Sequence, residues 1–504
     1  MTTARIPRLA VAARLIALAL AAATLAACGS LTRSDYTAPA LAVPAQWGAA
    51  AAPAGSAAAA SPSADAAVPS ATVPGLAADS SDNARLARAS TVRALQLDGW
   101  WRSFGDADLD ALIDRLLVRN NDLAAATLRV RQAQLSAGLA ADALLPAASA
   151  SASTTQGRYL NGNGRTRSSS VSAGLSWEAD LWGRLAAQRD ASRWEAVATD
   201  EDRAATALSL VGTAATLHFD LGYLNQRIAL GEASIADARR TLELIQLQYR
   251  AGAVSSLEID EARQTLAALE AGQTTLLLQR DQDRHALALL FDAAPGSVEP
   301  AEPVTLSAAA LPDIPAGLPA GLLARRPDLR AAEARLRSSL ASVDATRLYY
   351  YPAFSLTGAL GSSSVALANV LSNPVATLGA GLSLPFLQQT ERQLSIASQQ
   401  AAYAEAVVNF RQTFYAALGE VEDALSARTQ YAAQARGLEE SLAAARRAEA
   451  AYELRYRAGS VALRVWLDAQ RTRRDAEAAL AANRLNRLLN LVTLHQALGG
   501  RAEG

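Results

Sequence analysis

The feature that most constrains this chain is the length of its two proline-free stretches. No proline occurs between Gly183 and Ala294, nor between Phe386 and Gly504, and both stretches are rich in Ala, Leu, Arg, Glu and Gln. Proline disrupts a helix interior and these other residues favour helix, so the sequence predicts very long helices. A helix from about Gly183 to Tyr249 would be roughly 100 Å long at about 1.5 Å per residue, far longer than helices of ordinary globular domains.

Apolar and small residues follow a helical period in both stretches. In the first they recur at alternating steps of four and three, at Leu210, Ala214, Leu217, Leu221, Leu224, Ile228, Gly231, Ile235, Ala238, Leu242, Ile245 and Tyr249. The second has the same spacing at Phe414, Leu418, Val421 and Leu425. This pattern predicts coiled-coil seams, and a soluble coiled-coil spacer would explain it equally well.

The body of the chain repeats itself once. Asp122-Leu123 and Pro146 recur as Asp328-Leu329 and Pro352, at a constant offset of 206 (328 − 122). Tyr249-Arg250-Ala251-Gly252 recurs as Tyr456-Arg457-Ala458-Gly459 at an offset of 207 (456 − 249). The sequence therefore predicts a duplicated unit, with a first repeat over 99–300, a linker over 301–327 and a second repeat over 328–504.

The segments between the predicted helices alternate with a period of two. After Pro146 comes an Ala/Ser run, a Gly/Asn turn from Gly157 to Gly164, and a second alternating run up to Trp177. The second repeat has matching runs over 354–360 and 377–384. Strands of about ten residues with one apolar and one small polar face are typical of membrane barrels, which start at about eight strands. Four strands cannot close such a barrel, so the chain is expected to share one with copies of itself.

The N-terminus has the layout of an export signal. Arginines precede and interrupt an apolar run of 15–25, which is too short to span a bilayer and ends in Leu25-Ala26-Ala27-Cys28. This end resembles the bacterial lipobox, which implies a signal peptide over 1–27 and a mature chain starting at Cys28 with a diacylglycerol thioether and an N-acyl chain. By resemblance to known lipoproteins, in which an aspartate after the cysteine favours retention in the inner membrane, Gly29 and Ser30 imply the outer membrane. Residues 28–98 form the lipidated segment, within which the Ala/Ser/Pro-rich 48–90 is expected to be a flexible tether.

Composition and motifs argue against several other functions. The formal net charge is −1, so nothing suggests a nucleic-acid partner. The three histidines, His218, His285 and His495, are expected on apolar helical faces, scattered along the chain, and the body contains no cysteine. No phosphate loop or metal-spaced cluster occurs. We therefore expect no catalysis, no metal and no cofactor other than the covalent lipid.

Several motifs together resemble the outer-membrane efflux protein family (TolC-like, NodT-type lipoprotein branch). The resemblance covers almost everything except 48–90, and it rests on Tyr36-Thr37-Ala38-Pro39 with Trp47, Trp100-Trp101-Arg102-Ser103-Phe104-Gly105-Asp106, Trp177-Glu178-Ala179-Asp180-Leu181-Trp182-Gly183, Arg326-Pro327-Asp328-Leu329 and Glu420-Val421-Glu422-Asp423-Ala424-Leu425.

This family implies a mainly α fold with transmembrane β-structure, in which coiled-coil helices form a periplasmic α-barrel. Each protomer of a homotrimer would give four strands to a twelve-stranded outer-membrane β-barrel. The implied function is a passive outer-membrane channel that works with a periplasmic adaptor protein and an inner-membrane RND pump. The alternatives are a channel for type I protein secretion and a structural periplasmic coiled-coil lipoprotein.

Two turns between long helices are the candidate docking sites for the adaptor. In the first turn, Gly252 suits the left-handed end of a helix. Ser255 and Glu258 follow at the spacing of a capping box for the next helix. In the second, Ser460 is the expected N-cap. The predicted docking residues are Arg250, Ala251, Gly252 and Ala253 in the first tip and Arg457, Ala458, Gly459 and Ser460 in the second.

The resemblance also places a gate just past the second turn. Asp468 stands where relatives carry an acidic residue at the closed periplasmic mouth, and Arg471 stands one helical turn on. Tyr456, at the end of the preceding helix, is assigned to the same gate. A ring of acidic side chains in a narrow pore favours cations, and pairing with arginine would hold neighbouring helices together.

Overall fold

A computed structural model describes residues 32–44, 46–48, 99–160, 162, 164–296, 301–307, 310–314 and 319–500. The predicted signal peptide, Cys28 and most of the 48–90 tether lie outside these residues. The chain divides into two compact units. We call residues 1–41, 128–201 and 330–413 the strand unit, and residues 42–127, 202–329 and 414–504 the hairpin unit.

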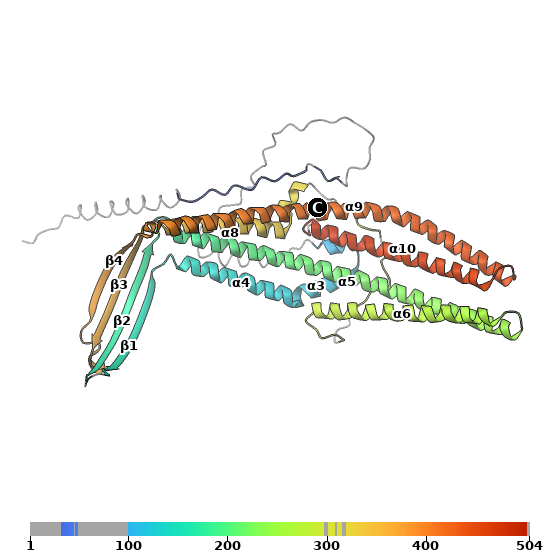
Figure 1. Ribbon diagram of the computed structural model, residues 1–504, viewed down its shortest axis with the longest axis horizontal. Helices are drawn as coiled ribbons and strands as arrows, with labels where there is room; N and C mark the ends of the chain where they lie inside the picture. The colour runs from blue at the N-terminus through green and yellow to red at the C-terminus, as the bar shows by residue number, and fades with distance from the viewer. Residues whose placement is uncertain are drawn as a thin grey trace, which may run out of the picture. The chain divides into compact units, whose positions relative to one another are not determined.

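Four strands form one antiparallel sheet in the strand unit, in the order β1-β2-β3-β4 (Figure 1). They are β1 (Ala147–Arg158), β2 (Arg165–Ala179), β3 (Ala353–Ser364) and β4 (Val375–Ser383). Short 3-10 turns follow β3 at η4 (Leu367–Asn369) and β4 at η5 (Pro385–Leu387). The four predicted strands are confirmed, and β2, at 15 residues, is longer than the ten expected.

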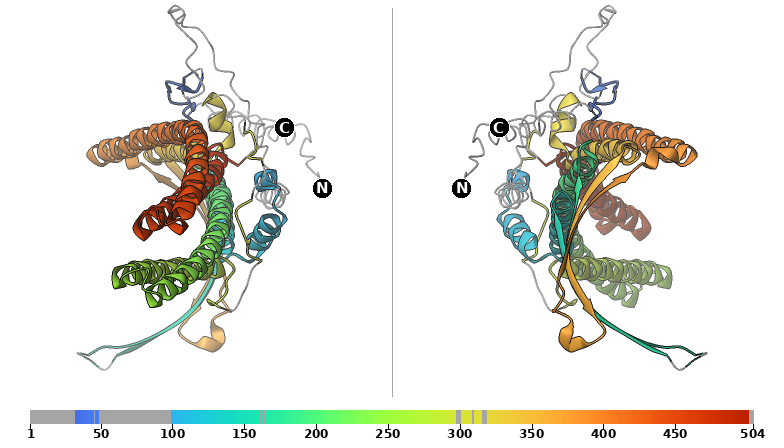
Figure 2. Two further views of the ribbon diagram at one scale, coloured as in Figure 1. Left: turned by 90° about the vertical axis from the view of Figure 1, so that its right-hand side faces the viewer. Right: turned by 90° about the vertical axis from the view of Figure 1, so that its left-hand side faces the viewer.

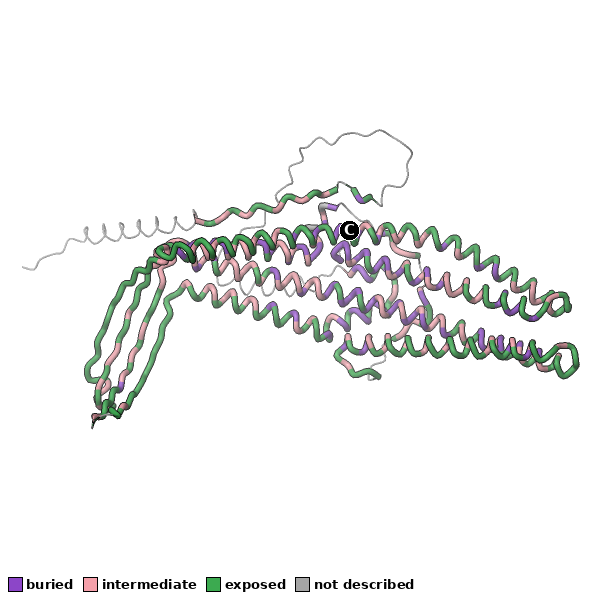
Figure 3. The backbone as a smooth tube through the Cα atoms, viewed as in Figure 1, coloured by how far each residue is buried: buried purple, intermediate pink, exposed green. Residues whose placement is uncertain are grey.

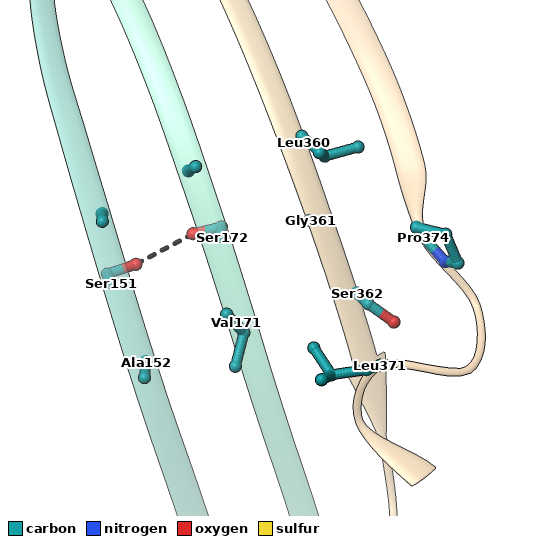
Figure 4. A pocket seen from close by; sticks show the side chains of 11 residues that line it. Ser151, Ala152, Val171, Ser172, Leu360, Gly361, Ser362, Leu371 and Pro374 are labelled. Carbon is teal, nitrogen blue, oxygen red and sulfur yellow. Dashed lines mark hydrogen bonds between the residues drawn. The ribbon is translucent and has the colours of Figure 1, made fainter.

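The pairing register gives the sheet two chemically different faces. Leu175 lies opposite Gly358, which in turn lies opposite Leu378, so apolar residues of neighbouring strands share one face. The other face carries hydroxyls, and the Ser151 and Ser172 side chains are hydrogen-bonded across β1 and β2 at 2.9 Å (Figure 4). A hollow on the sheet lies among Val171, Leu360 and Leu371, the last of which comes from the β3–β4 connection (Figure 4). The alternation of apolar and polar residues in the sequence therefore corresponds to the two faces of the sheet.

The turn from β2 into the first long helix is held by the Trp177–Gly183 motif. The Asp180 carboxylate accepts hydrogen bonds from the backbone N–H groups of Leu185 (3.0 Å) and Ala186 (2.8 Å), which have no partner within the helix. The Trp182 indole N–H donates to the backbone oxygen of Pro352 at 2.8 Å. This bond joins the end of β2 to the start of β3, so the motif fixes where the sheet meets the helices.

Four helices leave the sheet. They are α4 (Asn121–Asp142), α5 (Arg184–Arg250), α8 (Pro327–Tyr349) and α9 (Gln389–Arg457). The boundary between the two units falls within each of them. Helices α5 and α9 contain 67 and 69 residues, which confirms the very long helices predicted from the absence of proline.

The first described residues, 32–41, are tied to the rest of the strand unit although they form no helix or strand. Thr32 Oγ1 donates to the backbone oxygen of Trp182 at 2.7 Å. The Ser34 backbone N–H and hydroxyl each donate to the Asp344 carboxylate at 2.7 Å, and Arg33 forms an ion pair with Asp190 at 2.8 Å. The chain therefore enters the described structure beside the junction of β2 and α5.

The hairpin unit contains two helical hairpins, α5–α6 and α9–α10 (Figures 1 and 2). In these hairpins, α6 spans Ser256–Leu290 and α10 spans Leu463–Ala497. The further elements of the unit are η2 (Trp100–Phe104), α3 (Ala107–Arg119), η3 (Pro319–Gly321) and α7 (Leu322–Arg325). Most residues of the predicted α5 seam are buried, although Tyr249 is exposed. Among the described residues, no helix combines the length and the apolar character needed to cross a bilayer.

Two of the three histidines lie in the core of the hairpin unit. His495 is stacked on Trp100 with ring centroids 4.7 Å apart. His218 is buried and lies 2.9 Å from Asp106, whose carboxylate also caps α3. His285 is exposed, so the expectation of an apolar setting is wrong for this residue. The prediction for His285 is wrong because only a narrow stripe of α6 is buried, and most of the helix surface is open to solvent.

Candidate gate and docking tips

The first hairpin tip has the predicted geometry. Helix α5 ends at Arg250, and Gly252 adopts a φ of 74°, the left-handed conformation that favours glycine. The Ser255 backbone N–H donates to Glu258 Oε2 at 3.0 Å, and the Leu257 N–H donates to Ser255 Oγ at 3.2 Å. This reciprocal capping box confirms the predicted start of α6. The hydrogen bond from Ser255 holds the pKa of the Glu258 carboxyl below its ordinary value.

The second tip repeats the glycine but not the cap. Gly459 has a φ of 71°. The Ser460 hydroxyl donates back to the Arg455 backbone oxygen at 3.0 Å, at the end of α9. The N-cap of α10 is Ala462, and no side chain caps it. The prediction of Ser460 as N-cap is wrong because two further residues precede the helix, and the hydroxyl satisfies a carbonyl of the preceding helix instead.

All eight residues predicted to dock the adaptor are exposed at these two tips (Figure 3). A Cβ added at Gly252 or Gly459 would meet no heavy atom within 4 Å. A Cβ would therefore meet no steric clash at either glycine, and only the left-handed backbone conformation disfavours other residues there. Both tips are therefore open to solvent in the single chain.

Just behind the tips, an apolar cluster joins the two hairpins. Its buried members are Ile245, Ile259 and Ala262 from α5–α6 and Leu463, Trp466 and Leu467 from α9–α10. Tyr456 is stacked on Trp466, with ring centroids 5.3 Å apart and an interplanar angle of 22°. The Tyr456 hydroxyl donates to Gln248 Oε1 at 2.9 Å. Tyr456 thus ties α9 to α5 through its hydrogen bond to Gln248 and to α10 through its ring contact with Trp466.

The setting of Tyr456 also affects its acidity. Partial burial raises the pKa of the Tyr456 phenol, and the nearby negative charge of Glu258 raises it further. The phenol is therefore protonated throughout the physiological range and remains a donor. The resemblance assigned Tyr456 to the gate without indicating its partner, because nothing in the pattern distinguishes Gln248 from other polar residues of the helix.

Asp468 and Arg471 lie on the exposed surface of α10, with about 70% and 76% of their side chains accessible. Within this one chain they do not pair with each other. Asp468 lies 4.0 Å from Arg464, and Arg471 lies 3.6 Å from Asp475, each pair being one turn apart on the helix. Exposed pairs of this kind contribute little to stability, so both charges are available to a neighbouring molecule.

Ion pairs farther along the hairpin join α9 to α10. Arg473 of α10 lies 2.5 Å from Glu449 of α9, and Arg446 of α9 lies 3.0 Å from Glu477 of α10. Arg473 and Glu477, both in α10, are also paired at 2.7 Å. Nothing in the sequence pattern points to this network, because the residues that pair across the hairpin are separated by more than twenty positions and follow no motif. In the part of the chain that the structure describes, no group of three His, Cys, Asp or Glu side chains is placed to hold a metal ion.

Comparison with known proteins identifies the family. The family model for outer membrane efflux proteins matches residues 112–291 and 318–500. The chain belongs to the outer membrane efflux protein family. This outer-membrane efflux protein is 32% identical over 425 residues to the pyoverdine export outer membrane protein OpmQ of Pseudomonas putida, covering 82% of this chain and 90% of that one. It is 28% identical over 496 residues to the antibiotic efflux pump outer membrane protein ArpC of the same species, covering 96% of this chain and 95% of the relative.

Solved structures give the same result for the fold. The efflux protein superimposes on CusC with a TM-score of 0.76 at 24% identity, covering 93% of this chain and 99% of CusC. It matches the open state of the MtrE outer membrane channel of Neisseria gonorrhoeae with a TM-score of 0.66 at 29% identity, covering 78% of this chain and 88% of MtrE. The predicted family, fold class and outer-membrane location are thereby confirmed, and the chain is an outer-membrane component of an efflux system. Members of the family are channel proteins rather than enzymes.

Proposed function

We propose that the chain forms, as a homotrimer, the outer-membrane channel of a tripartite RND-type efflux system, a passive conduit for small molecules. The observation that carries this proposal is the open four-stranded sheet, in which β1 and β4 each have a partner on one side only. Unpaired backbone groups are costly in hydrocarbon, so the two edges require strands from other copies. Three chains supply twelve strands, and an even number of strands in this range closes a barrel.

The hydroxyl-bearing face of the sheet supports the channel role. Ser151 with Ser172 and Ser153 with Ser170 form hydrogen-bonded pairs across β1 and β2, and Thr357 lies opposite Gly379 on β3 and β4. These small polar groups suit a water-filled lumen that passes solutes without binding them tightly. The apolar face would then contact lipid.

The exposed tips support docking of a periplasmic adaptor, through which an inner-membrane pump supplies the energy. A trimer would present six tips, two from each chain. The pyoverdine and antibiotic relatives bear names that refer to export, which favours a similar role for this chain. In such an assembly the pump and adaptor select the substrate, because a passive conduit does not need to bind what it passes.

Behind the tips, Asp468, Arg471 and Tyr456 form the proposed periplasmic gate. The two charged side chains lie three residues apart and therefore share one exposed face of α10. Around a threefold axis, the aspartates of three chains would form an acidic ring that favours cations. The bond between Tyr456 and Gln248 would hold the hairpins of each chain together when the gate is closed.

Cys28 is the proposed lipid anchor, carrying a diacylglycerol thioether and an N-acyl chain. Thr32, four residues later, lies beside the carbonyl of Trp182 at the junction of sheet and helices. Four residues span at most about 14 Å, so the anchor would be held near the membrane surface. Radiolabelled palmitate should label the wild type and not Cys28→Ala, and labelling of the variant would disprove lipidation at this residue.

The channel itself is tested by purifying the full chain in detergent. We expect a trimer by native mass spectrometry and discrete single-channel currents in planar lipid bilayers. A stable, water-soluble monomer without detergent would contradict the shared sheet and favour a structural coiled-coil lipoprotein.

A further inference from the structure

The charged residues of the strand segments are confined to one place. Between Asp142 and Glu178 the only charged side chains are Arg158, Arg165 and Arg167, and no charged residue occurs between Arg347 and Glu391. Arg158 ends β1, while Arg165 and Arg167 begin β2. All three therefore lie at the end of the β1–β2 hairpin that is far from the helices (Figure 1).

The register places the three arginines on one face. Arg158 lies directly opposite Arg165, and Gln156 lies directly opposite Arg167. Alternate residues of a strand share a face, so Arg165 and Arg167 lie on the same side of β2 as Val171. This is the apolar face, which the proposed barrel turns towards lipid rather than towards the lumen.

The spacing along β2 matches the thickness of a membrane. Arg167 and Trp177, which share this face, are ten residues apart (177 − 167). Ten residues extend about 33 Å along a strand, or roughly 25 Å across the membrane at a tilt of about 40°. This equals the height of the apolar band of outer-membrane barrels. If the indole marks the inner border of the band, the arginines lie at the outer border, at the level of the lipid headgroups.

No acidic group compensates these charges. Arg158, Arg165 and Arg167 are all exposed, and none is paired with a carboxylate among the described residues. Like charges directly opposite each other destabilise a strand pair, so the arrangement of Arg158 against Arg165 is unfavourable unless an anion lies between them. Guanidinium groups bind phosphate through paired hydrogen bonds, which an isolated hydroxyl or carbonyl of a lipid does not offer.

We propose that Arg158, Arg165 and Arg167 form a binding site for the phosphate groups of the phosphorylated glycolipid of the outer leaflet, lipopolysaccharide. This inference rests on the proposed function, because it requires a membrane barrel in which the β1–β2 turn lies on the outer side. The apolar residues below the arginines contact the acyl chains of the same lipid. The site thus holds the channel at a fixed depth in the membrane.

The test compares binding of fluorescent lipopolysaccharide to three forms of the detergent-solubilised full chain. They are the wild type, the triple variant Arg158→Gln, Arg165→Gln, Arg167→Gln, and a control triple variant Arg119→Gln, Arg129→Gln, Arg131→Gln, which removes three exposed helix charges. We expect roughly hundredfold weaker binding for the first triple variant, since each of its three basic residues contributes about fivefold at a membrane surface. The control should bind like the wild type. Dephosphorylated lipopolysaccharide should bind the wild type as weakly as the intact lipid binds the first triple variant.

Equal affinities of the wild type and the first triple variant would overturn the proposal. So would equal binding of the intact and dephosphorylated lipids to the wild type, an outcome that does not depend on folding of a variant. Displacement of the lipid by millimolar sodium phosphate would assign the arginines to free phosphate instead. Single-channel conductance is measured in parallel and should be the same in the wild type and the first triple variant, because the arginines face away from the lumen. If the wild type bound the lipid but passed no current, the proposed channel function would be contradicted and the lipid-binding site would not.

Discussion

Removing the Tyr456 hydroxyl tests whether the two hairpins of each chain are held together when the gate is closed. The hydroxyl donates one hydrogen bond, of 2.9 Å, to Gln248. Tyr456→Phe deletes this bond and keeps the ring that is stacked on Trp466. Because the variant preserves the apolar cluster, any effect on the gate reports on the hydrogen bond itself.

A hydrogen bond of this kind contributes about 1 kcal/mol net, since water replaces the lost partner where the site is partly exposed. If opening separates the hairpins, the bond is lost in the open state and its deletion destabilises the closed state only. Three chains in a trimer then sum to about 3 kcal/mol, which shifts the closed-to-open equilibrium by roughly a hundredfold. We expect a large rise in open probability with little change in thermal stability.

Single-channel recording in planar bilayers measures this shift directly. Tyr452→Phe is the matched control, because Tyr452 packs against the same cluster and its hydroxyl makes no hydrogen bond to another described residue. Equal open probabilities for Tyr456→Phe and the wild type would refute the reasoning. The hydrogen bond would also lose its proposed role if Tyr452→Phe opened the channel as much as Tyr456→Phe.

Three further predictions concern the tips, the gate charge and the core. Gly459→Asp, which forces a side chain into a left-handed turn, should abolish drug efflux in susceptibility assays while the trimer still forms; Gly437→Asp, within α9, is the control. Asp468→Ala should raise conductance and lower cation preference, and reversal potentials identical to wild type would make it a surface aspartate. Burial lowers the pKa of His495 from 6.5 to about 4, so the folded state binds a proton less readily than the unfolded chain. The free energy of unfolding should therefore decrease by roughly 3 kcal/mol as the pH falls from about 6.5 to about 4. In His495→Phe this loss, measured by thermal unfolding, should be largely absent.

The local elements were predictable because short-range rules determine them. Helices α5 and α9 follow from the absence of proline over more than sixty residues, and the capping box follows from the spacing of Ser255 and Glu258. The faces of the sheet follow from alternation, since a shift of one residue would turn every apolar side chain to the other side. In each case the deciding contacts lie within a few residues or repeat with a fixed period.

The contacts between distant segments were not predictable. Tyr456 reaches Gln248 across 208 positions of sequence, and Arg473 reaches Glu449 from the facing helix. Any of several polar residues on α5 would have served equally well as a partner for Tyr456. The pairing of Asp468 with Arg464 was missed for a different reason. The resemblance directed attention to Arg471, whereas helix geometry allows an aspartate to pair equally well with a residue four positions earlier.

The duplication makes the two tips directly comparable, and their difference bears on which hairpin moves. Both share Tyr-Arg-Ala-Gly with a left-handed glycine, but α6 starts with a reciprocal cap, whereas the N-cap of α10, Ala462, makes no side-chain hydrogen bond. A missing N-cap costs a helix about 1 kcal/mol, so the first turn of α10 is less stable than that of α6. That turn carries Leu463 and Trp466, which belong to the apolar cluster between the hairpins, and Asp468 lies two residues beyond Trp466. The weaker helix start therefore lies where the proposed gate must move, and the stronger one lies in the hairpin against which it closes.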